Sequence, residues 1–308
     1  AERQGSVCVR ALDAVKGLMP DAAEAAEGPE ETEMHLAQAF EVLKTGLKDL
    51  QAVGLAQNFQ DFISAAGTRL GKTSDETAPT QPIAPLIVDE APTFAQTRIY
   101  FARLALEELL LARTLARFAA ADEAFSVSES GQPDDALIAE VTGRAHADEQ
   151  QRLAVSTALK RRLMVVSGGP GTGKTTSVRA IVALFERMGL NVLLAAPTGR
   201  AAKRMGELCD RDAQTIHRML GMTFNDQTGE VTFTKGEKEP LEADALIVDE
   251  TSMVDLSLMR ALLAALRPGC RLVLVGDPDQ LPSVGAGNVF SDLIRSGRIA
   301  TVALRDIF

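Results

Sequence analysis

A glycine-rich run in the second half of the chain has the residue types and spacing that bind phosphate groups. It reads GGPGTGKTT, follows the apolar run LMVVS and precedes the helical stretch SVRAIVALFERMG. In this strand, loop and helix arrangement, backbone N–H groups turn inward around phosphates. The lysine, Lys174, would act on the β and γ phosphates, and the hydroxyl of Thr175 would meet Mg²⁺. The predicted ATP-binding residues are Gly168, Gly169, Pro170, Gly171, Thr172, Gly173, Lys174, Thr175 and Thr176.

Polar residues at the ends of two other apolar runs could complete a catalytic site. In ALIVDETSMVD, Asp249 is predicted to hold Mg²⁺, and Glu250 to orient and deprotonate an attacking water. In LVLVGDPDQLPSVGAG, Gln280 can hydrogen-bond both a γ-phosphate and a water, which makes it a candidate catalytic sensor. The alternative for Gln280 is a surface loop shaped by Pro and Gly.

Basic residues follow another strand-like run in AAPTGRAAKRM. The backbone N–H groups of this helix start, with Arg200, Lys203 and Arg204, would suit a phosphodiester backbone. Solvated helix charges are the equally open alternative. His217, in QTIHRMLG, is on its own more often structural than a ligand. Residues 223–240 alternate β-branched or aromatic with polar residues, which predicts a short β-hairpin that projects from the core.

The elements that must position these residues form an α/β pattern. From about residue 147 the runs LMVVS, NVLLAAP, ADALIVDE, RLVLVGD and IATVAL alternate with helical stretches. This alternation predicts a parallel sheet with flanking crossover helices, because parallel strands need such connections. The predicted ATPase domain therefore covers residues 147–308.

The first half of the chain has a different pattern of apolar and polar residues. Apolar residues recur at spacings of three and four over residues 1–66, which predicts a mostly helical N-terminal domain, with a plain helical bundle as first choice. Residues 67–93 have the Pro, Thr and Gly content of a linker or irregular arm. Residues 94–146 form a helical segment, in which residues 94–120 are predicted as one helix and a break at SESGQPDD precedes a new helix near Asp134.

Composition sets limits on the class of protein. The 308 residues are 46% hydrophobic and 24% charged, as in globular proteins that bury a large core. No apolar run is long enough to span a membrane and the first residues lack a signal-peptide pattern, which predicts a cytoplasmic location without a membrane partner. Cys8, Cys209 and Cys270 are expected to be reduced thiols. A net charge of −10 still leaves room for a local positive groove.

These motifs, in this order, carry a family resemblance. From about Glu149 to Phe308 the chain has EQQRLAV, GGPGTGKTT, AAPTGRAAKRM, TIHRML, VDETSMVD, GDPDQLPSVGAGNVFSDL and VALRDIF. It resembles the RecD-like branch of superfamily 1 DNA helicases, and very closely the longer bacterial form that acts without RecB and RecC partners. The resemblance implies a RecA-like ATPase domain with ATP and Mg²⁺ as cofactors. It also implies movement from 5′ to 3′ on single-stranded DNA and at single-strand/duplex junctions, in repair or recombination.

The resemblance implies roles for further residues. Gln151 matches the glutamine that reads adenine, and the hairpin at about 223–240 matches a pin that splits the duplex. The residues implied along the DNA strand are Thr198, Gly199, Arg200 and His217.

The resemblance also implies an expectation about the end of the sequence. In this branch the strand that resembles VALRDIF is followed by an arginine that reaches the γ-phosphate and by a second RecA-like domain. We therefore expect Phe308 to be a cut, with the missing second domain C-terminal to it. Because such an arginine is typically worth about 10³ to 10⁵ in rate, the chain alone is expected to hydrolyse ATP slowly. Protein partners are not predicted.

Two other function classes stay open. One is a non-hydrolysing, ATP-gated module that binds DNA or protein. The other is the motor part of a conjugative relaxase-helicase, whose N-terminus would carry a nucleophilic tyrosine and a histidine metal triad. This chain has one tyrosine and three histidines, and they are not clustered in that way.

Overall fold

The chain divides into two units, Ala1–Leu109 and Leu110–Phe308, with the boundary inside helix α5 (Ala102–Ser128). The structure is a computed structural model that describes residues 8–10, 56–58, 86–89, 98–128, 135–144, 147–225 and 230–307. The boundary at Leu109 lies ahead of residue 147, where the ATPase domain is predicted to start. The domain limits inferred from composition therefore stay a prediction.

The first unit contains a four-stranded sheet. Its strands, in the order in which they pair, are β1 (Cys8–Arg10), β4 (Arg98–Phe101), β3 (Leu86–Asp89) and β2 (Ala56–Asn58). Strands β1 and β3 run antiparallel to β4, whereas β2 runs parallel to β3. The sheet joins segments that are far apart in sequence.

This sheet corrects part of the sequence analysis. Residues 8–10 and 56–58 are strands within a region predicted to be helical, and residues 86–89 form a strand within the predicted linker. Residues 98–101 are a strand as well, so the predicted helix of 94–120 begins only at Ala102. Helical periodicity reports one apolar face, but here pairing with distant strands decides the conformation. The remaining residues of the predicted helical bundle and linker lie outside the described residues.

The second unit contains a six-stranded sheet in which each neighbouring pair is parallel. Five strands are the predicted apolar runs, and the short edge strand β7 is the one the sequence analysis missed. In spatial order they are β12 (Ala300–Leu304), β5 (Leu163–Gly168), β11 (Arg271–Gly276), β10 (Ala245–Val248), β6 (Val192–Ala196) and β7 (Ala213–Thr215). This arrangement confirms the predicted α/β class with a P-loop, RecA-like sheet.

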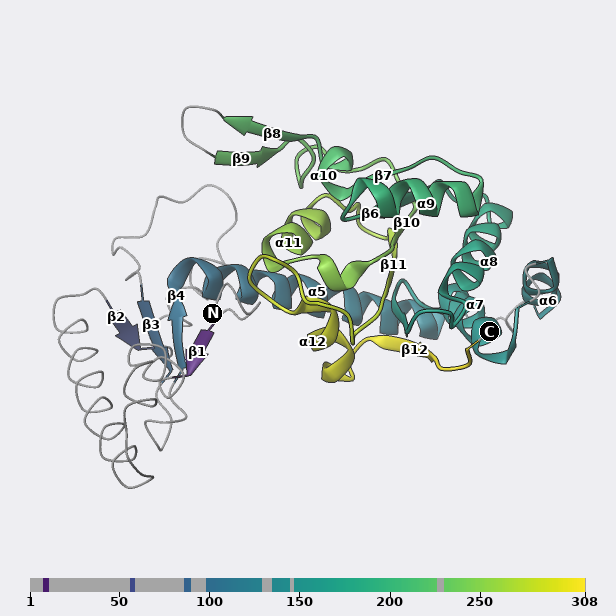
Figure 1. The fold of residues 1–308 in the computed structure, drawn as a ribbon, viewed down its shortest axis with the longest axis horizontal. Helices are drawn as coiled ribbons and strands as arrows, with labels where there is room; N and C mark the ends of the chain where they lie inside the picture. Colours follow the sequence, from purple (N-terminus) through teal and green to yellow (C-terminus); the bar gives the residue numbers. More distant parts are fainter. Residues whose placement is uncertain are drawn as a thin grey trace, which may run out of the picture. The chain divides into compact units, whose positions relative to one another are not determined.

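Helices cover both faces of this sheet (Figure 1). One face packs into a core with α6, α7 and α8, around fully buried residues such as Phe185 and Ile247. Helices α11 and α12 lie on the opposite side (Figure 1). The helices are α6 (Asp135–Arg144), α7 (Glu149–Lys160), α8 (Lys174–Arg187), α9 (Gly199–Cys209), α10 (Ile216–Met219), the 3₁₀ helix η3 (Thr251–Met253), α11 (Leu256–Ala264) and α12 (Val289–Ser296).

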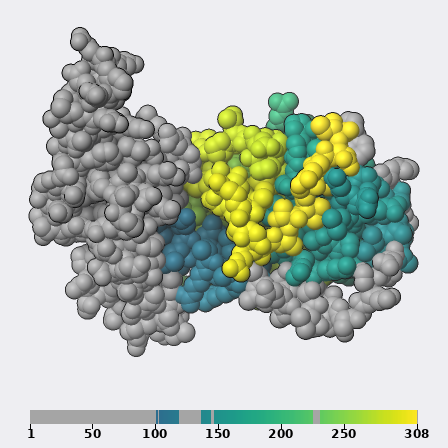
Figure 2. All heavy atoms as spheres, turned by 90° about the horizontal axis from the view of Figure 1, so that it is seen from below, coloured from purple at the N-terminus to yellow at the C-terminus, as the bar shows by residue number. Residues whose placement is uncertain are grey.

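Strand β12 forms one edge of the sheet and is only partly covered. Its burial alternates along the strand, with Val302 and Leu304 buried and Thr301 and Ala303 exposed. Figure 2 shows the C-terminal residues, in yellow, on the surface of the second unit. Within the described residues, no helix combines the length and apolar character needed to cross a membrane.

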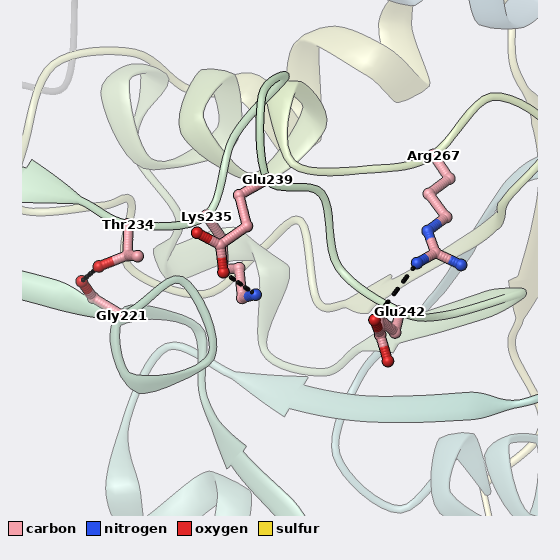
Figure 3. Close-up of polar contacts among 6 residues, drawn as sticks. All are labelled: Gly221, Thr234, Lys235, Glu239, Glu242 and Arg267. Carbon is pink, nitrogen blue, oxygen red and sulfur yellow. Dashed lines mark hydrogen bonds and ion pairs between the residues drawn. The ribbon is translucent and has the colours of Figure 1, made fainter.

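The predicted hairpin is present and projects from the core (Figure 1). Strands β8 (Met222–Asn225) and β9 (Glu230–Phe233) pair antiparallel. The root of the hairpin is closed by hydrogen bonds, because Thr234 donates through its N and Oγ1 to the carbonyl of Gly221, at 3.2 and 3.1 Å (Figure 3). Gly221 has φ +64°, and a Cβ there would come within 3.0 Å of Thr234. The hairpin therefore leaves the domain through a tight, glycine-dependent turn.

Candidate nucleotide site

A cavity of about 610 Å³ is lined by residues at the carboxyl ends of the central strands. Parallel α/β sheets bind ligands at this edge, because the connecting loops diverge there. Its walls come from the loop after β5, helix α9, the turn after β10 and the loop after β11. The lining residues are Gly169, Pro170, Gly171, Thr172, Gly173, Lys174, Thr175, Val178, Thr198, Arg200, Ala201, Arg204, Met205, Leu208, Cys209, Asp249, Glu250, Met253 and Gln280.

The glycine-rich loop after β5 needs its glycines. Gly171 and Gly173 both have φ +78°, a left-handed conformation that L side chains rarely adopt. A Cβ on Gly168 would lie 2.5 Å from Thr172 Oγ1 and 2.9 Å from the carbonyl oxygen of Leu304. The loop is further closed by Thr172 Oγ1, which donates to the carbonyl of Gly169 at 2.9 Å. The local sequence therefore folds into the tight, glycine-dependent loop that its pattern predicts, and phosphate binding there stays a prediction.

Lys174 is the first residue of α8 and its ammonium group lies over this loop. Its Nζ donates to the carbonyls of Gly168 and Gly169, at 2.6 and 2.9 Å. Both are ordinary carbonyl acceptors, so a phosphate that enters the cavity would offer the ammonium a stronger, charge-assisted partner. Thr175, the next residue, also lines the cavity, whereas Thr176 does not.

Asp249 and Glu250 directly follow strand β10. The N–H of Asp249 continues the sheet by donating to Ala195 O at 2.9 Å, and its Oδ1 accepts from the N–H of Glu250 at 2.9 Å. Glu250 has φ +52°, a left-handed conformation that is uncommon for residues other than glycine. Within the described part of the chain, its buried Oε2 has no hydrogen-bond partner. Buried carboxylate oxygens normally have partners, so this one marks a site built to receive another group.

Burial shifts the acidity of both carboxyl groups in the same direction. Burial raises the pKa of Asp249, against the N–H of Glu250 and the charges of Lys174 and Arg204, which lower it. Burial also raises the pKa of Glu250, and the neighbouring charge of Asp249 adds to the rise. A carboxylate with a raised pKa is a better proton acceptor near neutral pH. The environment of Glu250 therefore suits a general base.

The loop after β11 carries Gln280 to the cavity. Asp277, only 3% exposed, holds the turn: its Oδ1 accepts from the N–H of Asp279 at 3.0 Å, and its carbonyl from the N–H of Gln280 at 3.3 Å. Gln280 itself is exposed and lines the cavity. The three predicted catalytic residues, Lys174, Glu250 and Gln280, thus line one cavity.

Other predicted residues lie outside the cavity lining. Gln151 is 3% exposed, and its Oε1 accepts from the N–H of Asp148 at 3.2 Å in the capping box of α7. His217, on α10, is half-buried, and its ring centroid lies 6.4 Å from that of Phe233 in the hairpin. Gly199 starts α9 without lining the cavity. The adenine and DNA roles of these residues stay predictions.

Two of the residues predicted to lie along DNA, Thr198 and Arg200, also line the cavity, and their DNA role stays a prediction. Thr198 caps α9, with its Oγ1 accepting from the N–H of Ala201 at 3.3 Å, and Arg200 lies in the first turn. The sequence analysis named Arg204 only as a nearby positive charge, yet it lines the same cavity. Its spacing of four residues from Arg200 is the signal that could have placed both on one helix face.

A thiol on α9 completes the cavity wall. Cys209 is half-buried and is a free cysteine, as is the buried Cys270. Burial raises the pKa of the Cys209 thiol to about 11. Because the thiolate is the reactive form, this residue has the character of a structural thiol, as predicted for the cysteines.

The oxygen donors of the cavity fit a magnesium ion that is shared with a ligand. The donors predicted to hold the ion, the Thr175 hydroxyl and the Asp249 carboxylate, both line the cavity. Among the described residues, no group of three or more His, Cys, Asp or Glu side chains could hold a metal. Mg²⁺ usually binds through one or two carboxylates plus waters and substrate phosphates, so this sparse donor set suits it.

Comparisons with known proteins agree with this site. The profile of a family described as "AAA domain" matches residues 151–286. The chain is 39% identical over 218 residues to an ATP-dependent RecD2 DNA helicase from Deinococcus radiodurans, covering 71% of this chain and 28% of the relative. It is 44% identical over 169 residues to the RecBCD enzyme subunit RecD from Mycolicibacterium smegmatis, covering 47% of this chain and 30% of the relative.

Among solved structures, the Pif1 helicase from Candida albicans aligns with a TM-score of 0.39 and 25% identity, over 53% of this chain and 40% of that chain. The chain spans less than a third of the length of the two RecD relatives. The comparisons confirm the resemblance that the motifs predict: this chain is similar to RecD-like DNA helicases.

Proposed function

We propose that this chain binds ATP with Mg²⁺ and hydrolyses it as part of a DNA helicase. One observation carries the proposal: three separate segments bring Lys174, Asp249, Glu250 and Gln280 to a single cavity beside a glycine-rich loop. A phosphate-binding loop, a carboxylate pair and a neutral amide are the parts that phosphoryl transfer to water requires. The similarity to the ATP-dependent RecD2 DNA helicase of Deinococcus radiodurans supports ATP and DNA as the ligands.

Each residue has a proposed task. Lys174 neutralises the phosphates, and Thr175 and Asp249 would hold Mg²⁺, which when bound supplies further charge neutralisation. Glu250 takes a proton from the attacking water through its buried carboxylate. Gln280 donates to the terminal phosphate and accepts from that water. Gln151, which matches the family's glutamine, is proposed to read adenine.

The proposed nucleic-acid ligand is single-stranded DNA, with 5′ to 3′ movement in repair or recombination. Thr198, Gly199, Arg200 and His217 are proposed to lie along it, and the β8–β9 hairpin to meet the duplex at a junction. The hairpin exposes apolar side chains, with Phe224 58% and Val231 49% exposed. Apolar and aromatic surfaces of this kind suit stacking against unpaired bases.

Binding of a fluorescent ATP analogue with Mg²⁺ tests the core of the proposal. Lys174→Ala is expected to weaken binding by about 100-fold, since charge-assisted hydrogen bonds are worth about 3 kcal/mol at most. Lys203→Ala is the matched control, because Lys203 lies outside the cavity lining and pairs with Glu207 on the exposed face of α9. This control variant is expected to bind as the wild type does.

Hydrolysis is measured on the same protein, with and without a single-stranded oligonucleotide. ATP-dependent turnover above the level of Lys174→Ala supports the enzyme. Binding without turnover, even at high protein concentration and with DNA, would favour the non-hydrolysing module. Equal ATP affinity in the wild type and Lys174→Ala would contradict the proposed nucleotide site itself.

A further inference from the structure

One face of helix α9 borders the cavity. The residues of α9 that line it follow a helical stripe: Arg200, Ala201, Arg204, Met205, Leu208 and Cys209. Residues spaced by four lie on the same face of a helix, so Arg200 and Arg204 are stacked one turn apart. Lys203 and Glu207 lie outside the lining and pair with each other at 3.8 Å, with 80% and 66% of their side chains exposed. Helix α9 therefore carries Arg200 and Arg204 on the face that borders the cavity, and the Lys203–Glu207 ion pair on its exposed face.

Among the described residues, Arg204 differs from the surface cations in having no carboxylate within ion-pair distance. In the described part of the chain it makes no hydrogen bond or ion pair, whereas Lys203, Lys235 and Arg211 each pair with a glutamate. The positive charge of Arg204 lowers the pKa of Asp249 and of Glu250, which opposes the effect of burial on both groups. Arg204 therefore lies in the same cavity as the carboxylate pair and within its electrostatic reach.

The charge balance of the cavity calls for a second cation. Lys174 is the cation beside the glycine-rich loop, and its Nζ is already held by the loop carbonyls of Gly168 and Gly169. A bound triphosphate would add several negative charges, of which Mg²⁺ removes only part. An unpaired guanidinium in the same cavity offers a planar fork of N–H donors that matches phosphate oxygens.

We propose that Arg204 is a nucleotide-binding residue whose guanidinium contacts the terminal phosphate of ATP. The proposal rests on the ATP site proposed above and extends it to helix α9. The terminal phosphate is the natural partner, because it is the part of the nucleotide that must lie beside the Asp249 and Glu250 carboxylates if water is to attack it. Arg204 is thus assigned to the nucleotide and not to the DNA strand.

The experiment compares the affinities for ATP and ADP, both with Mg²⁺, in Arg204→Ala and in the wild type. Loss of one charge-assisted contact is expected to weaken ATP binding by about tenfold or more. ADP lacks the terminal phosphate, so its affinity is expected to change by less than about twofold. Lys203→Ala, with the same charge removed from the other face of the same helix, is expected to leave both affinities unchanged.

Three results would overturn the assignment. They are an unchanged ATP affinity in Arg204→Ala, an equal loss for ATP and ADP, and a loss confined to single-stranded DNA measured by fluorescence anisotropy. Thermal unfolding of each variant ensures that a loss of affinity is not a loss of folding. Lys174→Ala, measured in parallel, separates the two proposals: if it abolishes ATP binding and Arg204→Ala does not, the ATP site stands and only the role of Arg204 fails.

Discussion

The two ends of the six-stranded sheet differ in how their polar groups are satisfied. At the carboxyl end, Glu250 holds a buried oxygen without a partner and a left-handed backbone, and the loop after β5 needs positive φ at its glycines. At the amino end, Arg271 is hydrogen-bonded to the end of helix α7, and Asn191 and Asp244 join the segments before β6 and β10. The carboxyl end is built to receive a ligand, and the amino end is built to hold the domain together.

Arg271 shows how the amino end is held. It is 7% exposed, and its Nη1 donates to the carbonyls of Ala158, Leu159 and Arg161 at 3.0, 3.1 and 3.3 Å. These carbonyls belong to the last turn of α7 and its C-cap, which have no partner within the helix. The guanidinium also lies over the ring of Phe185 in α8, 5.8 Å from its centroid. One side chain thus joins strand β11 to two helices.

The largest effect on stability is expected from Arg271→Met. Methionine keeps the apolar stem but removes every donor, so the carbonyls at the end of α7 lose a buried, charged partner. We expect a loss of about 3 kcal/mol. In a unit of this size that lowers the melting temperature by about 6–12 °C. Thermal unfolding measures the change, and ATP binding well below the melting temperature should be kept.

Arg267→Met is the matched control for this change. Arg267 is an arginine near the same end of the sheet, but it is exposed and faces Glu242 at 3.6 Å (Figure 3). Exposed ion pairs contribute about 0.2–1 kcal/mol, so this variant should melt close to the wild type. If Arg271→Met folded normally yet lost ATP binding, the division of the sheet into an amino end that stabilises the domain and a carboxyl end that binds a ligand would be wrong.

A smaller loss is expected from Asp244→Ala at the same end. Oδ2 of Asp244 accepts from the N–H of Asn191 at 2.8 Å, which joins the segment before β10 to the segment before β6. Both residues are exposed, so solvent replaces part of the lost bond and the expected cost is about 1 kcal/mol. Urea unfolding measures it. Asp244→Asn keeps an acceptor and should recover most of the stability; an equal loss in both variants would mean that the charge, not the hydrogen bond, matters.

The carboxyl end was far easier to predict from the sequence than the amino end. The P-loop, Asp249, Glu250 and Gln280 stand in short segments whose residue types carry their own chemistry, directly after recognisable apolar strands. The contacts of Arg271 reach carbonyls more than 100 positions earlier in the chain, and no local pattern reports them. The residues of the candidate site therefore stand in short, recognisable segments, whereas the contacts that stabilise the fold join residues far apart in the sequence.

Two further misses have the same cause. The strand Arg98–Phe101 is β-branched and aromatic in RIYF, a local signal that the helical periodicity of its neighbours concealed. The place of Arg204 in the cavity depends on how α9 is rotated about its axis, which is set by the burial of Ala202 and Met205. The sequence predicted that α9 exists, but the face that it turns toward the cavity follows from packing.

The smallest effect on stability is expected at the carboxyl end, from Glu250→Gln. The amide keeps the shape of the side chain without the charge, so stability at neutral pH should equal that of the wild type or exceed it by at most about 1 kcal/mol. ATP binding should be kept, whereas hydrolysis should be lost with the proton acceptor. Urea unfolding at neutral pH, with ATP binding and turnover on the same sample, tests these outcomes.

The pH dependence of this variant separates a buried base from a surface carboxylate. Burial raises the pKa of Glu250 above its ordinary 4.5, so the folded state binds this proton more tightly than the unfolded state. The wild type therefore loses stability as the pH rises from about 4.5 through the raised pKa, and keeps it fully below that range. Glutamine does not titrate, so in Glu250→Gln this fall should shrink to the part that Asp249, also with a raised pKa, contributes. Parallel stability curves for the two proteins from pH 4 to 8 would show that Glu250 is not a buried base, and the contrast between the two ends of the sheet would lose its main evidence.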